Sequence, residues 1–296
     1  MDHSLRRSIA LKNDQPDIFY TVNDLRDFLV NARTQDKKIG FVPTMGNLHQ
    51  GHLDLVQRAS DLSDVVIVSI FVNPMQFGPH EDFDTYPRTL NSDRQALAGH
   101  ACNAIFAPTV REIYPKGLST EIDVPSLSTI LCGHHRPGHF KGVATVVCKL
   151  LNIVQPDVAV FGNKDYQQLQ IIKALVQDLL LPVQVIGTDT KREPNGLAMS
   201  SRNAYLLESE KQLASMLYSS LTKVAQAVRD DTQIKTTLKE QKRLLTSAGF
   251  VLDYLEIRDA EDLSKTYVEA DTAVVLVAAK LGDARLIDNM IVNLLK

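Results

Sequence analysis

A nearly unbroken apolar run at residues 65–72, Val-Val-Ile-Val-Ser-Ile-Phe-Val, constrains the fold of this chain more than any other stretch. Apolar and β-branched residues at successive positions, without polar alternation, are typical of a strand that is covered on both faces. Such strands occupy the interior of parallel sheets, whose two faces are covered by helices. The run therefore predicts an α/β architecture in which further strands alternate with helices.

The first 190 residues show this alternation. Strands are expected at 39–42, 65–72, 104–107, 121–125, 157–161 and 183–186. Helices are expected at 21–32, 53–59, 92–99, 138–154 and 166–180, where apolar residues recur at helical spacing. The pattern predicts a doubly wound, Rossmann-like domain with a parallel sheet, and ligands bind such domains at the carboxyl ends of the strands.

The remaining residues have a different order of elements. Two helical patterns, at 209–229 and 234–248, precede three strand-like runs at 251–257, 272–279 and 285–292. Consecutive strands after helices are typical of an α+β unit with an antiparallel sheet. We therefore predict a larger domain at 1–190 and a smaller C-terminal lid domain at 191–296, with the ligand site in the cleft between them.

Composition narrows the class of protein. A chain of 296 residues with 44% hydrophobic content can form two cores, and a formal net charge of −3 argues against a nucleic-acid-binding surface. Cys102, Cys132 and Cys148 are odd in number and widely spaced, which favours free thiols in a reducing compartment. With no apolar run of about 18 residues and no apolar leader, we expect a cytoplasmic protein without a membrane span.

The stretch 41–52 combines a strand end, a turn and a helix start, and reads Phe-Val-Pro-Thr-Met-Gly-Asn-Leu-His-Gln-Gly-His. Pro43 should end strand pairing, and Gly46 and Gly51 permit a close-approaching backbone. The following helix start offers free N–H groups to a phosphate, and His49 and His52 should project from one face. A fragment of a zinc site and solvated histidines remain alternatives. The glycine spacing matches neither a dinucleotide fingerprint nor a P-loop.

The motif His-x-Gly-His in this stretch resembles the nucleotidylyltransferase superfamily, and the longer Pro-Thr-Met-Gly-x-Leu-His-x-Gly-His box is similar to the pantothenate synthetase family. Four further motifs follow in the family's order: Asn73-Pro74-Met75-Gln76-Phe77, Arg136-Pro137-Gly138-His139-Phe140-Lys141-Gly142-Val143, Gly162-Asn163-Lys164-Asp165 and Met199-Ser200-Ser201-Arg202-Asn203. The resemblance implies a cytoplasmic homodimer that joins pantoate to β-alanine. ATP would activate pantoate as an adenylate, and AMP and pyrophosphate would be released in the synthesis of a coenzyme A precursor.

The resemblance also implies which residues bind ATP. They are Met45, Gly46, Asn47, Leu48, His49, Gln50, Gly51, His52, Gly162, Asn163, Lys164, Asp165, Lys191, Met199, Ser200, Ser201 and Arg202. Among these, the resemblance and the chemistry favour catalytic roles for His49, His52, Lys164 and Arg202, since lysine and arginine pair with phosphate oxygens. Residues 199–203 resemble a mobile loop that closes on ATP. Taken alone, each segment also fits an ordinary polar turn or linker.

For pantoate and β-alanine, the resemblance points to Gln76, Gln168, Asn73 and His139. A glutamine amide both donates and accepts hydrogen bonds, which suits a hydroxy acid, although a surface glutamine in a turn is the simpler interpretation of either residue alone. Mg²⁺ is expected with the nucleotide, and Asp93 is a candidate ligand for it; no other metal site is predicted.

Two residues depart from the family pattern. Asn163 and Cys132 stand where glutamate is common, so the role of the first carboxylate cannot be transferred and an ion pair of Arg136 with the second is in doubt. His134 and His135 are expected to be loop residues. Two rival functions stay open. One is a nucleotidylyltransferase that leaves the nucleotide on its product. The other is a non-catalytic or tRNA-facing relative of the class I synthetases, which the missing basic surface disfavours.

Overall fold

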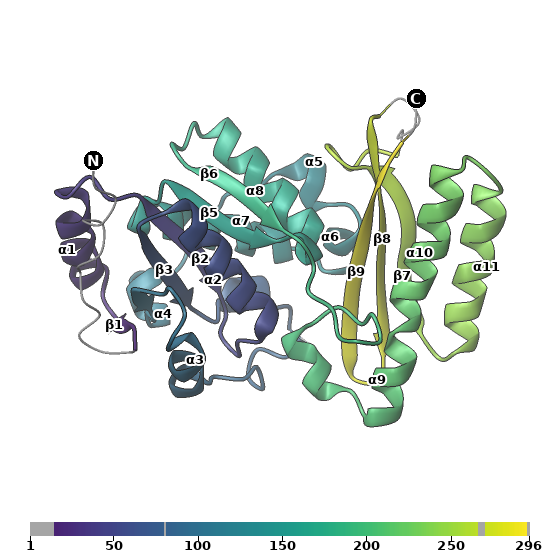
Figure 1. Ribbon diagram of the computed structural model, residues 1–296, viewed down its shortest axis with the longest axis horizontal. Coiled ribbons are helices and arrows are strands. Elements are labelled where there is room, and N and C mark those ends of the chain that lie inside the picture. Colours follow the sequence, from purple (N-terminus) through teal and green to yellow (C-terminus); the bar gives the residue numbers. More distant parts are fainter. Residues whose placement is uncertain (1–14, 80, 266–269, 295–296) are drawn as a thin grey trace, which may run out of the picture.

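The computed structural model describes residues 15–79, 81–265 and 270–294, and its first half is built on a six-stranded sheet (Figure 1). The strands are β1 (Asp17–Phe19), β2 (Ile39–Thr44), β3 (Val65–Ile70), β4 (Ala104–Phe106), β5 (Val158–Gly162) and β6 (Gln184–Thr188). Their order is β1-β4-β3-β2-β5-β6, and all the pairs are parallel. The predicted doubly wound α/β fold is confirmed.

The helices of this part are α1 (Val22–Arg33), α2 (Gln50–Leu62), α3 (Leu90–Leu97), α4 (Val110–Ile113), α5 (Pro125–Ser128), α6 (Cys132–His135), α7 (His139–Val154) and α8 (Tyr166–Asp178). Short 3₁₀ turns, η1 (Pro74–Gln76) and η2 (Asn163–Asp165), follow β3 and β5. Thr21 caps α1 by accepting a hydrogen bond from the Asp24 amide, as expected from its side chain.

The order in which the strands are added to the sheet reverses between β2 and β5. The chain winds outward on one side from β2 through β3 to β4, and then returns to place β5 on the other side of β2. In open α/β sheets, ligands bind outside the carboxyl ends of the strands at such a switch point. The turn with His49 follows β2 and the turn with Lys164 follows β5, so the topology brings these two sequence motifs together.

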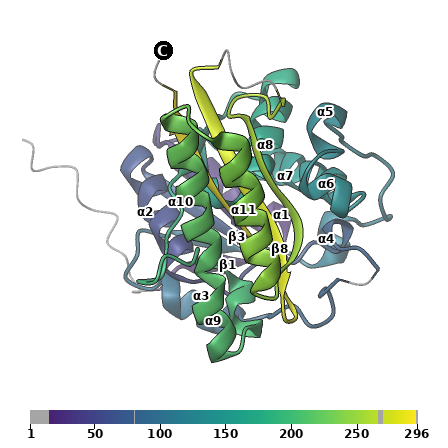
Figure 2. The same cartoon turned by 90° about the vertical axis from the view of Figure 1, so that its right-hand side faces the viewer.

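The C-terminal part contains the 3₁₀ turn η3 (Ser201–Tyr205), the helices α9 (Glu208–Ala214), α10 (Met216–Arg229) and α11 (Ile234–Ser247), and the strands β7 (Val251–Asp259), β8 (Thr272–Leu281) and β9 (Ala284–Asn293). The strands form an antiparallel sheet in the order β7-β8-β9, as predicted. Figure 2 shows α10 and α11 lying side by side over this sheet.

Alternating residues of β8 enter two different cores. Ala273, Val275 and Val277 belong to the core beneath α10, whereas Val274 and Leu276 belong to the core of the large parallel sheet. The C-terminal sheet is therefore packed on both faces, and one face is fixed to the N-terminal part. The division at 190/191 and the description of 191–296 as a lid domain stay predictions.

Three local predictions are wrong, and one strand was missed. Pro43 does not end the pairing of β2, which continues to Thr44 opposite Ile70. Residues 121–124 form no strand, because the Ile122 amide donates to Thr145 Oγ1 at 2.9 Å rather than to a neighbouring strand. The helix expected at 209–229 is divided into α9 and α10 at Ser215, whose hydroxyl donates to the Gln212 carbonyl. The edge strand β1 was missed, because three residues carry too little pattern. Among the described residues, no helix is long and apolar enough to span a membrane.

Candidate active site

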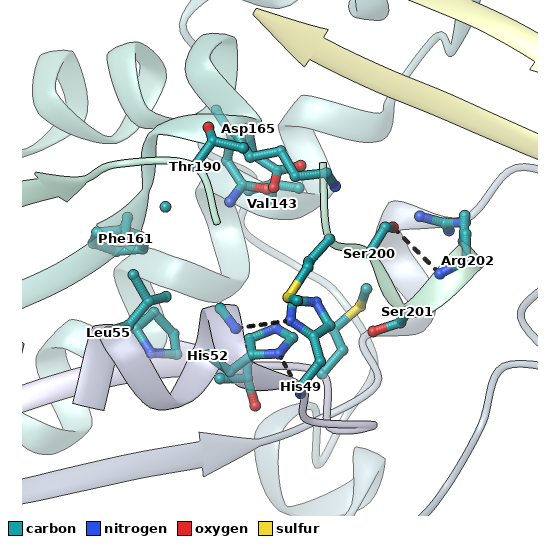
Figure 3. A pocket seen from close by; sticks show the side chains of 18 of the residues that line it. His49, His52, Leu55, Val143, Phe161, Asp165, Thr190, Ser200, Ser201 and Arg202 are labelled. Atoms are coloured by element: carbon teal, nitrogen blue, oxygen red, sulfur yellow. Dashed lines mark hydrogen bonds between the residues drawn. The ribbon is translucent and has the colours of Figure 1, made fainter. Parts of the chain in front are cut away.

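A cavity of about 220 Å³ opens at the carboxyl ends of β2 and β5 (Figure 3). It brings together most of the predicted residues from motifs far apart in the sequence. Those that line it are Met45, His49, Gly51, His52, Gln76, Gly162, Lys164, Asp165, Gln168, Lys191, Met199, Ser200, Ser201 and Arg202. Five predicted ATP-binding residues lie outside this lining: Gly46, Asn47, Leu48, Gln50 and Asn163.

His49 and His52 are locked in place by the start of α2. His49 is the N-cap residue, and its Nδ1 accepts a hydrogen bond from the Gly51 amide at 3.2 Å. The Nδ1 of His52 accepts from the His49 amide at 3.2 Å, so the two histidines form a reciprocal capping box. Their rings lie 4.1 Å apart between centroids. The backbone therefore sets the direction of both imidazoles before any ligand arrives.

These contacts also assign the tautomer of both rings. Since each Nδ1 accepts from a backbone N–H, it carries no proton, and the proton of the neutral ring is on Nε2. Burial and the nearby Lys164 ammonium lower the pKa of His49 to about 4. Burial, His49 and Lys164 lower the pKa of His52 to about 3. Both rings are thus neutral at pH 7, and each offers an Nε2–H donor.

Lys164 supplies a cation beside these neutral donors. It lies in η2, directly after β5, and lines the cavity together with Asp165. Lys191 also lines the cavity, where its ammonium is 3.1 Å from the carboxylate of Asp54 on α2. The cations come from turns that follow β5 and β6, so the parallel sheet places them opposite the turn that follows β2.

Asp93 holds the glycine turn rather than facing the cavity. Its side chain is 2% exposed and its carboxylate accepts from the amides of Asn47 and Leu48 at 3.1 and 2.8 Å. Gly46 has φ +83°, and a Cβ there would lie 2.9 Å from an Asp93 oxygen, so only glycine fits the turn. These contacts occupy the carboxylate that was a candidate Mg²⁺ ligand. Asn47 and Leu48 likewise contribute backbone atoms to the turn.

Asn73 and His139 lie behind Gln76 and do not line the main cavity. Asn73 is 1% exposed; its side chain donates to the Gln76 amide oxygen at 3.3 Å and accepts from Tyr114 at 2.9 Å. The Nδ1 of His139 donates to the Gln76 carbonyl at 2.7 Å, which leaves Nε2 to accept from Arg136 at 3.0 Å. Burial and Arg136 lower the pKa of His139 to about 3. Both residues thus hold Gln76 in place. The sequence had predicted that Asn73 and His139 themselves contact the substrate.

The segment 199–203 closes one side of the cavity. Ser201 donates to the Asn47 carbonyl at 3.2 Å, which joins the segment to the glycine turn. The Arg202 guanidinium makes two hydrogen bonds to the Asp82 carboxylate, at 3.1 and 2.9 Å. Figure 3 shows Ser200, Ser201 and Arg202 across from the paired histidines.

The predictions missed an apolar wall on the opposite side of the cavity. Its members are Leu55, Phe71, Val143, Val146, Val147, Leu150 and Phe161. Val143, Val147 and Leu150 recur at one-turn spacing on α7, but the whole helix is apolar, so its sequence does not separate cavity residues from core residues. No group of three or more metal-ligating His, Cys, Asp or Glu side chains occurs within the described parts of the chain.

The two departures from the family pattern have local partners. Arg136, whose ion pair was in doubt, pairs with Glu81, with one contact at 2.7 Å. The Cys132 thiol lies 2.9 Å from the Tyr254 hydroxyl and 3.4 Å from the Arg285 guanidinium. Asn163 donates to Asp189 at 3.2 Å. His134 and His135 end the single-turn helix α6, with His135 beside Asp253.

Comparison with known proteins decides between the functions left open by the sequence. The family described as Pantoate-beta-alanine ligase matches residues 17–291. The chain belongs to this family. The pantothenate synthetase of Shewanella oneidensis is 53% identical over 271 residues, which cover 91% of this chain and 96% of the relative. The enzyme is therefore a ligase that joins pantoate to β-alanine.

Two solved structures support the same assignment. The pantothenate synthetase of Thermus thermophilus has a TM-score of 0.87 and 42% sequence identity, and covers 93% of this chain and 98% of its own. The pantoate-β-alanine ligase of Francisella tularensis, complexed with Beta-gamma ATP and β-alanine, has a TM-score of 0.79 and 36% identity, with 93% and 97% coverage. The fold described above is thus that of the family.

Proposed function

We propose that the cavity between β2 and β5 carries out both steps of the ligation, with His49, His52, Lys164 and Arg202 acting on the phosphates of ATP. The observation that carries this proposal is the convergence of two Nε2–H donors and the Lys164 ammonium on one cavity at the switch point of the sheet. Hydrogen-bond donors and cations fixed before the reaction stabilise developing charge without further reorganisation.

In the first step, a carboxylate oxygen of pantoate attacks the α-phosphorus of ATP. The new O–P bond forms as the bond to the pyrophosphate oxygen breaks, and pyrophosphate leaves. Such a transfer requires positioning and charge neutralisation more than covalent help from the protein. Lys164 and Arg202 supply positive charge, and the neutral imidazoles of His49 and His52 donate hydrogen bonds to phosphate oxygens.

In the second step, the amine of β-alanine attacks the carbonyl carbon of the adenylate. The C–N bond forms, the bond from carbon to the AMP oxygen breaks, and one proton passes from the amine nitrogen to solvent to give the amide. The adenylate must be kept from water until the amine arrives. Residues 199–203, which lie against the glycine turn, are placed to exclude water.

Gln76 and Gln168 provide the polar part of the pantoate site, and the apolar wall provides the rest. Pantoate carries two methyl groups on one carbon, which suit the valine and leucine side chains of α7. Its hydroxyl groups and carboxylate require partners that both donate and accept, as a glutamine amide does. Asn73 and His139 hold Gln76 in position from behind.

Mg²⁺ would arrive with the triphosphate and neutralise part of its charge. The carboxylates on the cavity wall are Asp165 and Asp189, and such oxygen donors fit an ion that is held through one or two carboxylates and substrate phosphates. We assign them this role in place of Asp93, whose carboxylate is bound to the glycine turn.

Product identification tests the proposed chemistry. We expect mass spectrometry to detect pantothenate and AMP after incubation with ATP, Mg²⁺, pantoate and β-alanine. Without β-alanine, one equivalent of pantoyl adenylate should stay bound to the protein; without pantoate, ATP should remain intact. A product that keeps the nucleotide after β-alanine is added would contradict the two-step ligation.

Arg202→Ala is expected to slow adenylation and to release more free AMP per pantothenate formed. The guanidinium supplies charge to the phosphates, and its removal also unties the 199–203 segment from Asp82, which admits water to the adenylate. The measurement is the ratio of AMP to pantothenate in the steady state. Arg229→Ala, at an exposed site on α10, is the matched control. An unchanged ratio together with an unchanged rate would contradict this role.

We further propose that the enzyme acts in the cytoplasm as a homodimer, as in the family that it belongs to. Light scattering of the purified chain would then give twice the monomer mass of 32.9 kDa. A monomer at micromolar concentration would contradict this proposal.

A further inference from the structure

The strand β9 of the C-terminal sheet contacts the backbone of the η2 turn through one side chain, Asn289. The Nδ2 of Asn289 donates two hydrogen bonds, to the carbonyl oxygens of Asn163 and Lys164, each at 2.8 Å. Asn289 is 6% exposed, so the two carbonyl groups are hydrogen-bonded to a buried side chain and not to water. Both amide hydrogens are therefore used to hold the η2 turn that carries Lys164.

This arrangement fixes the backbone from which the Lys164 side chain extends. The side-chain amide of Asn289 has its two N–H groups in one plane. The two consecutive carbonyl groups that accept from it are therefore held in a fixed orientation. Without Asn289, both oxygens would lose their donor in a poorly hydrated place, and the turn would relax. The position of the ammonium depends on this turn, which joins β5 to α8.

The residue before Asn289, Asp288, binds Arg192, which lies next to the cavity residue Lys191. The Asp288 carboxylate accepts two hydrogen bonds from Arg192, at 2.6 and 2.9 Å, and one from the Asn289 amide at 2.8 Å. The Arg192 guanidinium also lies 4.1 Å from the centroid of the Tyr218 ring. Asp288 is 4% exposed, so its charge is matched by this buried pair.

Arg192 belongs to the segment that leads to the serines and Arg202 of the cavity. It forms an antiparallel bridge with Ala198, and the Met199 amide donates to the Lys191 carbonyl at 2.9 Å. Two consecutive residues of β9 thus hold two parts of the site. Asn289 contacts the η2 turn directly, and Asp288 is linked to residues 199–203 through Arg192.

We propose that Asn289 is a positioning residue for ligation, which sets Lys164 in place. Asp288, through Arg192, anchors the 199–203 segment at a fixed distance from Lys164. The C-terminal sheet would in this way contribute to catalysis without touching a substrate. The inference rests on the proposed role of Lys164 at the phosphates. It predicts that the effect of Asn289 on the rate is transmitted through the Lys164 side chain.

The test is a double-mutant cycle on single-turnover adenylation, with ATP and pantoate in the absence of β-alanine. Asn289→Asp has nearly the same shape but turns an acceptor toward two carbonyls, and Asn289→Ala removes the donor without adding repulsion. We expect each to slow adenylation by about 10- to 100-fold, since small displacements of catalytic groups have effects of this size. Asn293→Asp, at an exposed site on the same strand, is the control and should leave the rate unchanged.

The decisive comparison places the same substitutions in a Lys164→Ala background. If Asn289 acts through Lys164, its substitution should then change the rate less than about twofold, because residues that act as one unit are not additive. Two results would overturn the inference and leave Lys164 in its proposed role. One is a loss of adenylation rate as large as in the wild-type background, and the other is a loss of rate that only follows a lower melting temperature. A Lys164→Ala enzyme with normal adenylation would instead overturn that role, and the inference with it.

Discussion

Lys164→Ala is expected to slow formation of the adenylate by about 10²–10³-fold, the usual effect of removing a fixed donor from developing negative charge. The Lys164 ammonium interacts electrostatically with both paired histidines, because its charge contributes to the low pKa of each ring. The fold should be unaffected, since the side chain lines the cavity and is not part of a core. Rapid-quench measurement of adenylate and pyrophosphate in a single turnover gives the rate directly.

The matched control is Lys173→Ala, an exposed lysine on α8, the helix that follows the Lys164 turn. His52→Ala should have an effect of the same order on adenylation, although the ring acts as a neutral donor. Near-wild-type single-turnover rates in both active-site variants, with the control also normal, would show that neither side chain serves the phosphates.

Acidification from pH 6.5 to 5 is expected to cost the folded state about 3 kcal/mol through His52 and His139. Both have a folded pKa of about 3, below the usual 6.5, because burial disfavours the charged ring. The unfolded chain therefore takes up protons first as the pH falls. Each histidine contributes up to about 1.4 kcal/mol per pH unit in this range. The stabilisation is complete above pH 6.5 and declines as the pH falls towards the folded pKa.

Urea unfolding at pH 7.5, 6.5, 5.8 and 5.0 measures this slope. A loss of this size is a large part of the 5–15 kcal/mol that holds a typical domain folded. His139→Gln should flatten the slope by about one third, because His49 and His52 also have lowered pKa values. His134→Asn, an exposed neighbour on α6, is the control. A free energy of unfolding that is constant from pH 7.5 to 5 would contradict the neutral, buried state of these rings.

The sequence was sufficient for the parts of the fold that depend on strong local patterns. The apolar run at 65–72 predicted a parallel sheet, and its core, Val65–Ile70, is paired on both sides in that sheet. Residues 121–125 show the limit of such reasoning. Ile122 and Val124 alternate as in a strand, but they pack against the main core from an irregular segment. The alternation records which side chains are buried, and tertiary contacts decide the backbone conformation.

For the site, the sequence located the segments but not the orientation of their side chains. His49 and His52 were expected to face one ligand as a pair, but their neutral state and Nε2–H tautomer depend on backbone donors that only the folded turn provides. Asn73 and His139 belong to the right motifs, yet they support Gln76 from behind. Asn289 was missed, because a single asparagine in a strand has no sequence signal and its partners lie far away in the sequence, in the turn after β5.

A crystal structure with a non-hydrolysable ATP analogue and pantoate would show whether the paired histidines and Lys164 bind the phosphates. We expect the Nε2 atoms of His49 and His52 and the Lys164 ammonium to lie within about 2.7–3.2 Å of phosphate oxygens. We also expect the Nδ1 atoms to keep their hydrogen bonds to the backbone amides. Imidazoles turned away from the nucleotide, or bound to a metal ion, would contradict these expectations.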